Sequence, residues 1–176
     1  DVIFGVDLAT GKLAFEHENE EANVVAAAAG TFFITGYKSL RPFDHRGVRP
    51  PVMPLSFEGA RAFGALLVGS NEDRKTGVTS VISFDAEQMA AAGRIEIGHR
   101  AGVVKVYPGG ALGRVLVTTS DTHEILLLDL RTETVVWRTS IAPWGALSAA
   151  WVDGCVVASL AGAMKHLLPR AILLDP

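Results

Sequence analysis

Short apolar runs separated by polar turn residues follow one another along almost the whole chain. Each run has four to eight residues rich in valine, isoleucine, leucine and phenylalanine, which is typical of buried β-strands and too short for most helices. The runs lie at 1–7, 23–29, 31–37, 65–71, 79–85, 102–108, 114–120, 124–130, 147–153, 155–161 and 170–175. This pattern predicts an all-β protein.

One stretch, DAEQMAAAG at 85–93, is richer in residues that favour a helix. Asp85 can cap such a helix and Gly93 can end it. An isolated helix of this length is marginal, however. We therefore predict a short turn inserted between two strands.

An apolar residue followed by aspartate recurs at the end of the β-rich runs. The aspartates are separated by 37, 41, 44 and 46 residues, and they are Asp7, Asp44, Asp85, Asp129 and Asp175. A four-stranded blade of a β-propeller repeats about every 40–45 residues. The flanking runs supply strands before and after each aspartate, so the pattern predicts about four blade-length repeats of four antiparallel strands.

The segment VDLATGKLAF, residues 6–15, raises the alternative of a phosphate-binding loop because it contains Gly11 followed by Lys12. Such a loop requires four residues between its two glycines and a hydroxyl residue after the lysine. Here five residues separate Gly5 from Gly11, and Leu13 stands in the hydroxyl position. A hairpin explains the segment better, with Asp7 capping the turn and Gly11 supplying a left-handed conformation.

The feature recurs loosely after the later aspartates. Gly47 follows Asp44 and Gly93 follows Asp85, whereas Glu133 occupies the position of Gly11 after Asp129. A left-handed conformation at Glu133 should cost about 1 kcal/mol. Trp137 lies eight residues after Asp129, as Phe15 lies eight after Asp7, which indicates a repeated structural packing position.

With these residues in view, the chain resembles β-propeller repeat proteins, particularly those with WD40 repeats. Residues 98–136 carry Gly98-His99, then Ser120-Asp121, and Leu128-Asp129 where Trp-Asp is usual. The resemblance implies structural roles within a blade for His99, Asp121 and Asp129, with His99 and Asp121 forming a pair. Leu128 cannot donate the indole N–H of the family's hydrogen-bonded network, so that network would be incomplete.

The opening hairpin is similar instead to quinoprotein-like propellers, whose blades carry a D-x-x-T-G-K-x-x-W pattern. Asp7, Thr10, Gly11 and Lys12 match, and Phe15 replaces the tryptophan. The motifs cover roughly 2–15 and 98–137, while the periodicity covers most of the chain. The choice between the two subfamilies stays open.

Residues 1–176 are predicted to form propeller repeats, as a single domain or as a fragment of one. Counted along the chain, the runs begin with the last two strands of one blade and end with three strands of another. Three full repeats lie between them. Four blades could close on themselves, whereas rings similar to WD40 proteins more often have about seven. Together with the absence of an initial methionine, this favours part of a larger ring.

Composition and charge narrow the classes of partner. The chain is 49% hydrophobic and 20% charged, with a net charge of −3. This gives no general electrostatic reason to bind nucleic acid. No apolar run approaches the length of a membrane span. The single cysteine, Cys155, excludes a disulfide within the chain and slightly favours an intracellular compartment.

The sequence offers no catalytic, cofactor or metal site. Its five histidines lack metal-ligand spacing, and no nucleophile elbow is present. Cys155 lies in an apolar run, where a buried and inert thiol is expected. The carboxylates of residues 69–77 lack calcium-loop spacing, so this segment is predicted to be a mobile surface connection.

The segment RPFDHRGVRPP, residues 41–51, is unusual among the strand-forming runs. Arg41, His45, Arg46 and Arg49 gather there, and they could bind an acidic partner or a phosphate. Alternatively, the segment is an exposed loop whose prolines protect a sheet edge.

These observations predict a non-catalytic propeller of the WD40 kind that scaffolds protein–protein contacts, with partners in a multi-subunit complex. One alternative is a quinoprotein-like propeller of an enzyme or assembly factor, which would need a calcium site and a quinone. Another is a reader of acidic or phosphorylated epitopes through Arg41–Arg49. The identity of the partner is not encoded in any motif.

Overall fold

The computed structural model describes residues 2–18, 24–35, 39–44, 47–48, 51–55, 57–162 and 170–174. These residues form strands and turns, and none of them is helical. The prediction of an all-β protein is therefore confirmed, and the described residues contain no helix that could cross a membrane.

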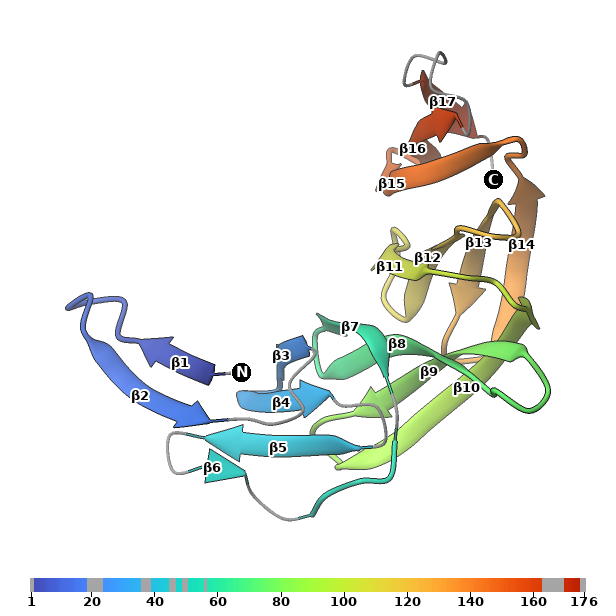
Figure 1. Cartoon of the computed structure of the whole chain (residues 1–176). Helices are drawn as coiled ribbons and strands as arrows, with labels where there is room; N and C mark the ends of the chain where they lie inside the picture. The colour runs from blue at the N-terminus through green and yellow to red at the C-terminus, as the bar shows by residue number, and fades with distance from the viewer. Residues whose placement is uncertain are drawn as a thin grey trace.

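The described strands form five antiparallel sheets in chain order (Figure 1). The first sheet pairs β1 (Val2–Val6) with β2 (Leu13–Glu18). The second contains β3 (Val24–Ala28), β4 (Thr31–Thr35), β5 (Leu40–Asp44) and β6 (Gly47–Val48). The third contains β7 (Glu58–Phe63), β8 (Leu66–Glu72), β9 (Val78–Asp85) and β10 (Ala90–His99).

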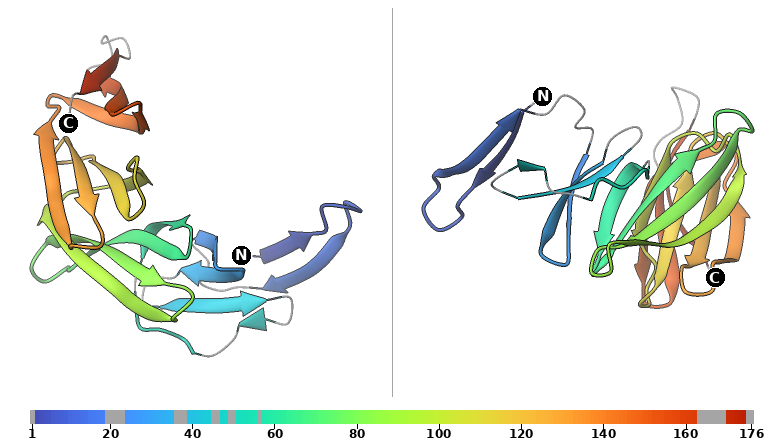
Figure 2. Two further views of the ribbon diagram at one scale, coloured as in Figure 1. Left: turned by 180° about the vertical axis from the view of Figure 1, so that it is seen from behind. Right: turned by 90° about the horizontal axis from the view of Figure 1, so that it is seen from below.

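The fourth sheet contains β11 (Val104–Pro108), β12 (Arg114–Thr119), β13 (Glu124–Asp129) and β14 (Thr134–Ser140). The fifth contains β15 (Trp144–Val152), β16 (Cys155–Gly162) and β17 (Arg170–Leu174). Within every sheet, strands that are consecutive in sequence are neighbours. The five sheets follow one another along an open arc, with β1–β2 at one end and β15–β17 at the other (Figures 1 and 2).

Each pair of neighbouring sheets encloses apolar side chains. The largest of these cores joins β7–β10 to β11–β14 and includes Val68, Val81, Val117, Leu126 and Leu128. Because the middle strands of a sheet are covered on both faces, β9 and β13 are almost continuously buried. The outer strand β14 instead alternates between exposed and half-buried positions. This explains why the middle strands are the clearest apolar runs in the sequence.

The apolar runs found in the sequence correspond to strands, but β7 was missed. Its sequence EGARAF has few apolar residues, and Gly59 adopts a φ of 64° where the pairing with β8 changes register. The prediction for residues 85–93 is confirmed at its start, where Ala86–Met89 form a turn. Residues 90–93, however, already belong to β10.

The same turn follows three strands, β1, β9 and β13. It is built by Asp7, Asp85 and Asp129, which lie at or directly after the ends of these strands. The Asp7 carboxylate accepts hydrogen bonds from the backbone N–H of Ala9 at 2.9 Å and of Thr10 at 2.8 Å. The carboxylates of Asp85 and Asp129 do the same with the residues two and three positions later. This local bonding competes with strand pairing and turns the chain.

The residue four positions after each of these aspartates is left-handed. It is Gly11 with a φ of 67°, Met89 with 53° and Glu133 with 54°. Gly93, the glycine noted after Asp85 in the sequence, is not part of this turn, because it pairs with Ser83 inside the sheet. Met89 and Glu133 occupy left-handed backbone without being glycine, so the turn is imposed by the aspartate and the sheet.

We expect Glu133→Gly to raise the free energy of unfolding by about 1 kcal/mol relative to Glu133→Ala. Both variants remove the carboxylate, but only glycine relieves the left-handed strain. Urea unfolding of the two variants measures the difference. Equal stabilities would contradict a strained residue 133.

Candidate functional site

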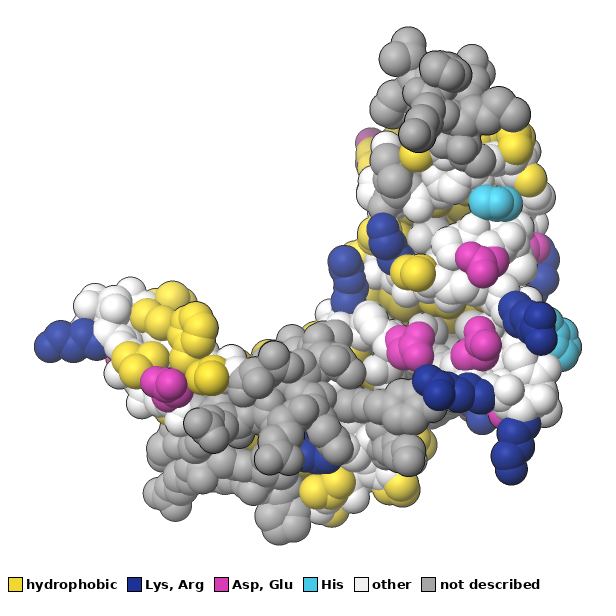
Figure 3. All heavy atoms as spheres, in the orientation of Figure 1, with side chains coloured by type: hydrophobic (Ala, Val, Ile, Leu, Met, Phe, Trp, Pro, Cys, Tyr) yellow, Lys and Arg dark blue, Asp and Glu magenta, His cyan; other side chains and the backbone are white. Residues whose placement is uncertain are grey.

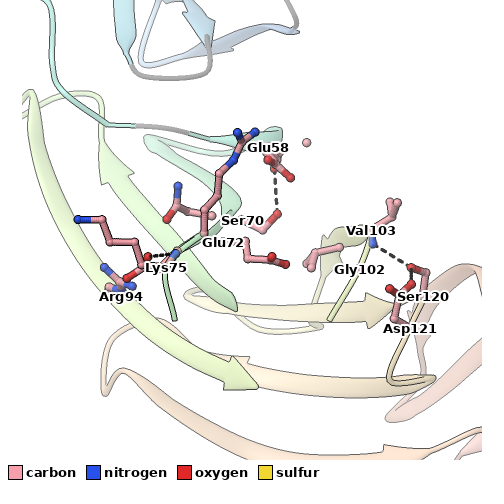
Figure 4. Close-up of a pocket in the computed structure, with 14 residues that line it drawn as sticks. Glu58, Ser70, Glu72, Lys75, Arg94, Gly102, Val103, Ser120 and Asp121 are labelled. Carbon is pink, nitrogen blue, oxygen red and sulfur yellow. Dashed lines mark hydrogen bonds between the residues drawn. The ribbon is translucent and has the colours of Figure 1, made fainter. Parts of the chain in front are cut away.

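A groove with a volume of about 920 Å³ opens between the sheets β7–β10 and β11–β14 (Figure 4). It lies at the end of the sheets where the β8–β9 and β12–β13 turns emerge. We call it the charged groove, and its charged lining residues are Glu58, Glu72, Asp73, Arg74, Lys75, Arg94 and Asp121.

The β8–β9 turn forms one wall of the charged groove. The Asp73 carboxylate accepts a hydrogen bond from the backbone N–H of Lys75 at 2.8 Å, and Gly77 closes the turn with a φ of 73°. This is the geometry of the Asp7 turn again, so residues 73–77 of the predicted mobile surface connection form a tight hairpin turn, while residues 69–72 belong to β8. Beside it, Arg94 donates from Nε to Ser80 Oγ at 3.1 Å, which holds one edge of its guanidinium.

The opposite wall is built by the β10–β11 and β12–β13 connections. Ser120 Oγ accepts a hydrogen bond from the backbone N–H of Val103 at 2.8 Å and donates one to Asp121 Oδ1 at 2.6 Å. Gly102, with a φ of 72°, passes so close that a Cβ there would overlap Asp121 Oδ1 and Ser120 Oγ. The glycine thus lets the two connections meet.

The floor carries Glu58 from β7 and Glu72 from β8, both exposed. Figure 4 shows them between Lys75 and Arg94 on one side and Asp121 on the other. Lys75 and Arg94 thus lie toward the β8–β9 turn, where the Asp73 carboxylate is engaged within the turn, while Glu58, Glu72 and Asp121 lie toward the centre and the β12–β13 turn. Figure 3 likewise shows basic and acidic side chains grouped over these two sheets.

Hydrogen bonds to the turn carboxylates lower their pKa values. The backbone N–H of Lys75 is the main cause for Asp73, that of Thr10 for Asp7 and that of Arg131 for Asp129; each pKa lies below the ordinary 3.8. Their stabilising contribution is therefore fully present above the unfolded pKa and is lost as the pH falls through the folded pKa.

We expect the free energy of unfolding to fall more steeply with acid in the wild type than in the triple variant Asp7→Asn, Asp73→Asn, Asp129→Asn. The asparagine carbonyl can still accept the backbone hydrogen bonds, but it does not titrate. Urea unfolding from about pH 6 to about pH 2.5 measures this difference. If the free energies of unfolding of the two proteins fall in parallel below pH 4, the turn carboxylates do not cause the loss of stability in acid.

Most residues predicted to bind a partner lie outside the described part of the chain. Arg41 lies on β5 and is half-buried, and its Nε donates to Ser39 Oγ at 2.9 Å. His45, Arg46 and Arg49 are not among the described residues. The binding role of this segment stays a prediction.

The residues assigned structural roles are distributed over three sheets. Asp129 Oδ2 pairs with Arg114 Nε at 3.2 Å, and Trp137 packs against the core shared with β15–β17. His99 is exposed at the end of β10, whereas Asp121 is bonded to Ser120 in the next sheet. Between these two described residues no hydrogen bond forms, so the implied His99–Asp121 pair is absent. Cys155 begins β16 and is half-buried rather than buried.

Sequence reasoning missed the charged groove, although two signals pointed toward it. The charged residues 73–75 and the Ser120-Asp121 pair both follow the second strand of a four-stranded unit. Equivalent turns of neighbouring repeats emerge at the same end of their sheets, so aligning the repeats would have placed them together. Among the described residues, no group of three or more histidine, cysteine or carboxylate side chains could hold a metal ion.

Comparison with known proteins identifies structures with a similar fold, but it finds no relative by sequence. No family model matches the chain, and no curated protein matches it. Among solved structures, BamB from Moraxella catarrhalis is similar with a TM-score of 0.67 at 18% identity, covering 98% of this chain and 55% of BamB. A protein of unknown function from Bacteroides caccae has a TM-score of 0.59 at 13% identity, covering 97% of this chain and 72% of its own.

Hydrazine synthase from Kuenenia stuttgartiensis is similar with a TM-score of 0.61 at 17% identity. The match covers 90% of this chain and 47% of the hydrazine synthase chain. This chain thus spans about half the length of BamB and of hydrazine synthase. Identities this low show the fold alone, and the fold they show is β-propeller-like, with antiparallel sheets arranged side by side.

Proposed function

We propose that this chain is a non-catalytic protein-interaction segment of a β-propeller and that the charged groove receives a polypeptide segment of a partner in a multi-subunit complex. The observation that carries the proposal is the gathering of cations and carboxylates in one groove between neighbouring sheets, with Lys75 and Arg94 at one side and Glu72 and Asp121 toward the other. The WD40-like sequence of residues 98–136 adds support, because such propellers commonly bind proteins.

The charge pattern suits a polypeptide with its own ordered charges. Lys75 and Arg94 would attract an acidic side chain, while Glu72 and Asp121 would attract a basic one further along the same segment. Complementary charges of this kind contribute mainly specificity, orientation and association rate. The groove is open and its charged groups are exposed, so the interaction should weaken as salt screens them.

We expect peptides selected from a random display library against this protein to bind the double variant Lys75→Glu, Arg94→Glu at least about tenfold more weakly. Fluorescence anisotropy with the labelled peptides at low and at physiological salt gives the affinities. The variant Lys12→Glu, which reverses an exposed charge in the distant β1–β2 turn, serves as the matched control. Selected peptides that bind the double variant and the wild type equally would refute the groove as the binding site.

A further inference from the structure

A second opening lies between the same two sheets at their other end, where the β7–β8, β11–β12 and β13–β14 turns emerge. Its volume of about 670 Å³ is within the range of about 300–1,000 Å³ typical of ligand pockets. We call it the apolar cleft, because most of its lining is apolar or glycine. The side chains that matter here are Phe63, Leu66, Pro108, Ala111, Leu112 and Leu130.

The apolar cleft continues the core that joins the two sheets. Phe63 and Leu66 are only partly buried and pack against that core from its edge. Leu112, in the β11–β12 turn, is 82% exposed. Leu112 thus adds an exposed apolar side chain to a lining that already holds the partly buried Phe63 and Leu66, and a largely apolar lining with few charged groups is typical of a binding pocket.

The β11–β12 turn that carries Leu112 is held by backbone hydrogen bonds. Arg114 N–H donates to the Ala111 carbonyl at 3.0 Å, and Leu130 N–H donates to the Gly113 carbonyl at 2.7 Å. The second bond ties the turn to the β13–β14 connection. The cleft is therefore preformed, and a partner would not have to order this wall on binding.

Three charged residues line the apolar cleft, and two of them are already engaged. The Asp85 carboxylate accepts the backbone N–H groups of Glu87 and Gln88, and Arg114 pairs with Asp129 at 3.2 Å. Among the described residues, the Arg131 guanidinium forms no hydrogen bond or ion pair. The cleft thus combines an apolar surface with one uncommitted positive charge at its edge.

We infer that the apolar cleft docks a segment of a partner protein that presents one large apolar side chain next to a carboxylate. The apolar side chain would lie against Phe63, Leu66 and Leu112, and the carboxylate would pair with Arg131. The planar guanidinium of Arg131, at the edge of the apolar surface, suits a carboxylate because the two groups can form two parallel hydrogen bonds. This extends the proposed function to a second surface, at the opposite end of the sheets from the charged groove.

The test uses a peptide display library in which a central phenylalanine, leucine or tryptophan is flanked by random residues. We expect the selected peptides to be enriched in Asp or Glu within two positions of the apolar residue. Their affinity, measured by fluorescence anisotropy, should fall at least about tenfold for Leu112→Asp and for Arg131→Glu. Peptides with Lys replacing the acidic residue should regain affinity for Arg131→Glu.

Two controls match these variants. Leu8→Asp places the same charge at a leucine that is 99% exposed in the β1–β2 turn, and it should leave binding unchanged. Lys75→Glu in the charged groove should also leave binding of these peptides unchanged. A wrong assignment of the apolar cleft can therefore be distinguished from a wrong assignment of the charged groove. Thermal unfolding of each variant establishes that it is folded.

Two outcomes would overturn the inference. One is a set of selected peptides without acidic enrichment, or with affinities that Leu112→Asp does not alter. The other is a concentration-dependent dimer in sedimentation that Leu112→Asp abolishes, since a second copy of the chain would then occupy the cleft.

Discussion

Replacing Phe84 with alanine is expected to lower the free energy of unfolding by about 3–5 kcal/mol. Phe84 is fully buried on β9. Its ring meets that of Phe33 edge-on, with 5.8 Å between the ring centroids. The two side chains join the sheets β3–β6 and β7–β10. The remaining contacts between the packed sheets keep them from moving together to fill the cavity that alanine would leave.

Phe32→Ala is the matched control, because Phe32 lies on the neighbouring strand position of β4 but is 44% exposed. We expect its loss to be about 1 kcal/mol. Urea unfolding followed by tryptophan fluorescence measures both. Similar losses for the two variants would contradict the packing of β9 against β4.

Replacing Gly110 with alanine is expected to cost about 2–5 kcal/mol. Gly110 has a φ of 81°, and a Cβ there would overlap the indole ring of Trp151 from the next sheet. The left-handed conformation accounts for about 1–2 kcal/mol of this cost. Overpacking against the indole accounts for about 1–3 kcal/mol more.

Gly64→Ala separates these two causes. Gly64 lies in the corresponding β7–β8 turn with a φ of 64°, and a Cβ there would meet no atom within 4 Å. It should therefore lose only the conformational part, about 1–2 kcal/mol. If the two variants lose equal stability in urea, Trp151 does not restrict residue 110.

The strands were predictable where both faces of a strand are buried, and less so elsewhere. The runs that became β9 and β13 are almost continuously apolar because neighbouring sheets cover them on both sides. The inner strand β7 has only one well-buried position, Ala60, and a glycine bulge at Gly59. Its sequence therefore lacks the periodicity that identifies a strand.

The charged groove and the apolar cleft were not predictable from residue types alone. Lys75 and Asp121 are far apart in sequence, and the motif that contains Asp121 indicated a structural role within one blade, not a shared groove. The same holds for Leu112 and Arg131, which come from successive hairpins of one sheet. Their proximity depends on how hairpins and sheets pack, which is decided by apolar contacts between strands distant in the chain.

The sequence by itself determined the all-β class, the aspartate-capped turns after Asp7, Asp85 and Asp129, and the middle strands, because these depend on hydrogen bonds and apolar runs within a few residues. Only the tertiary structure decided which turns emerge side by side, which glycine must exclude a Cβ because Trp151 is there, and which arginine forms no side-chain hydrogen bond or ion pair with the described residues. Those features arise where two sheets meet, and no short stretch of sequence contains both of their surfaces.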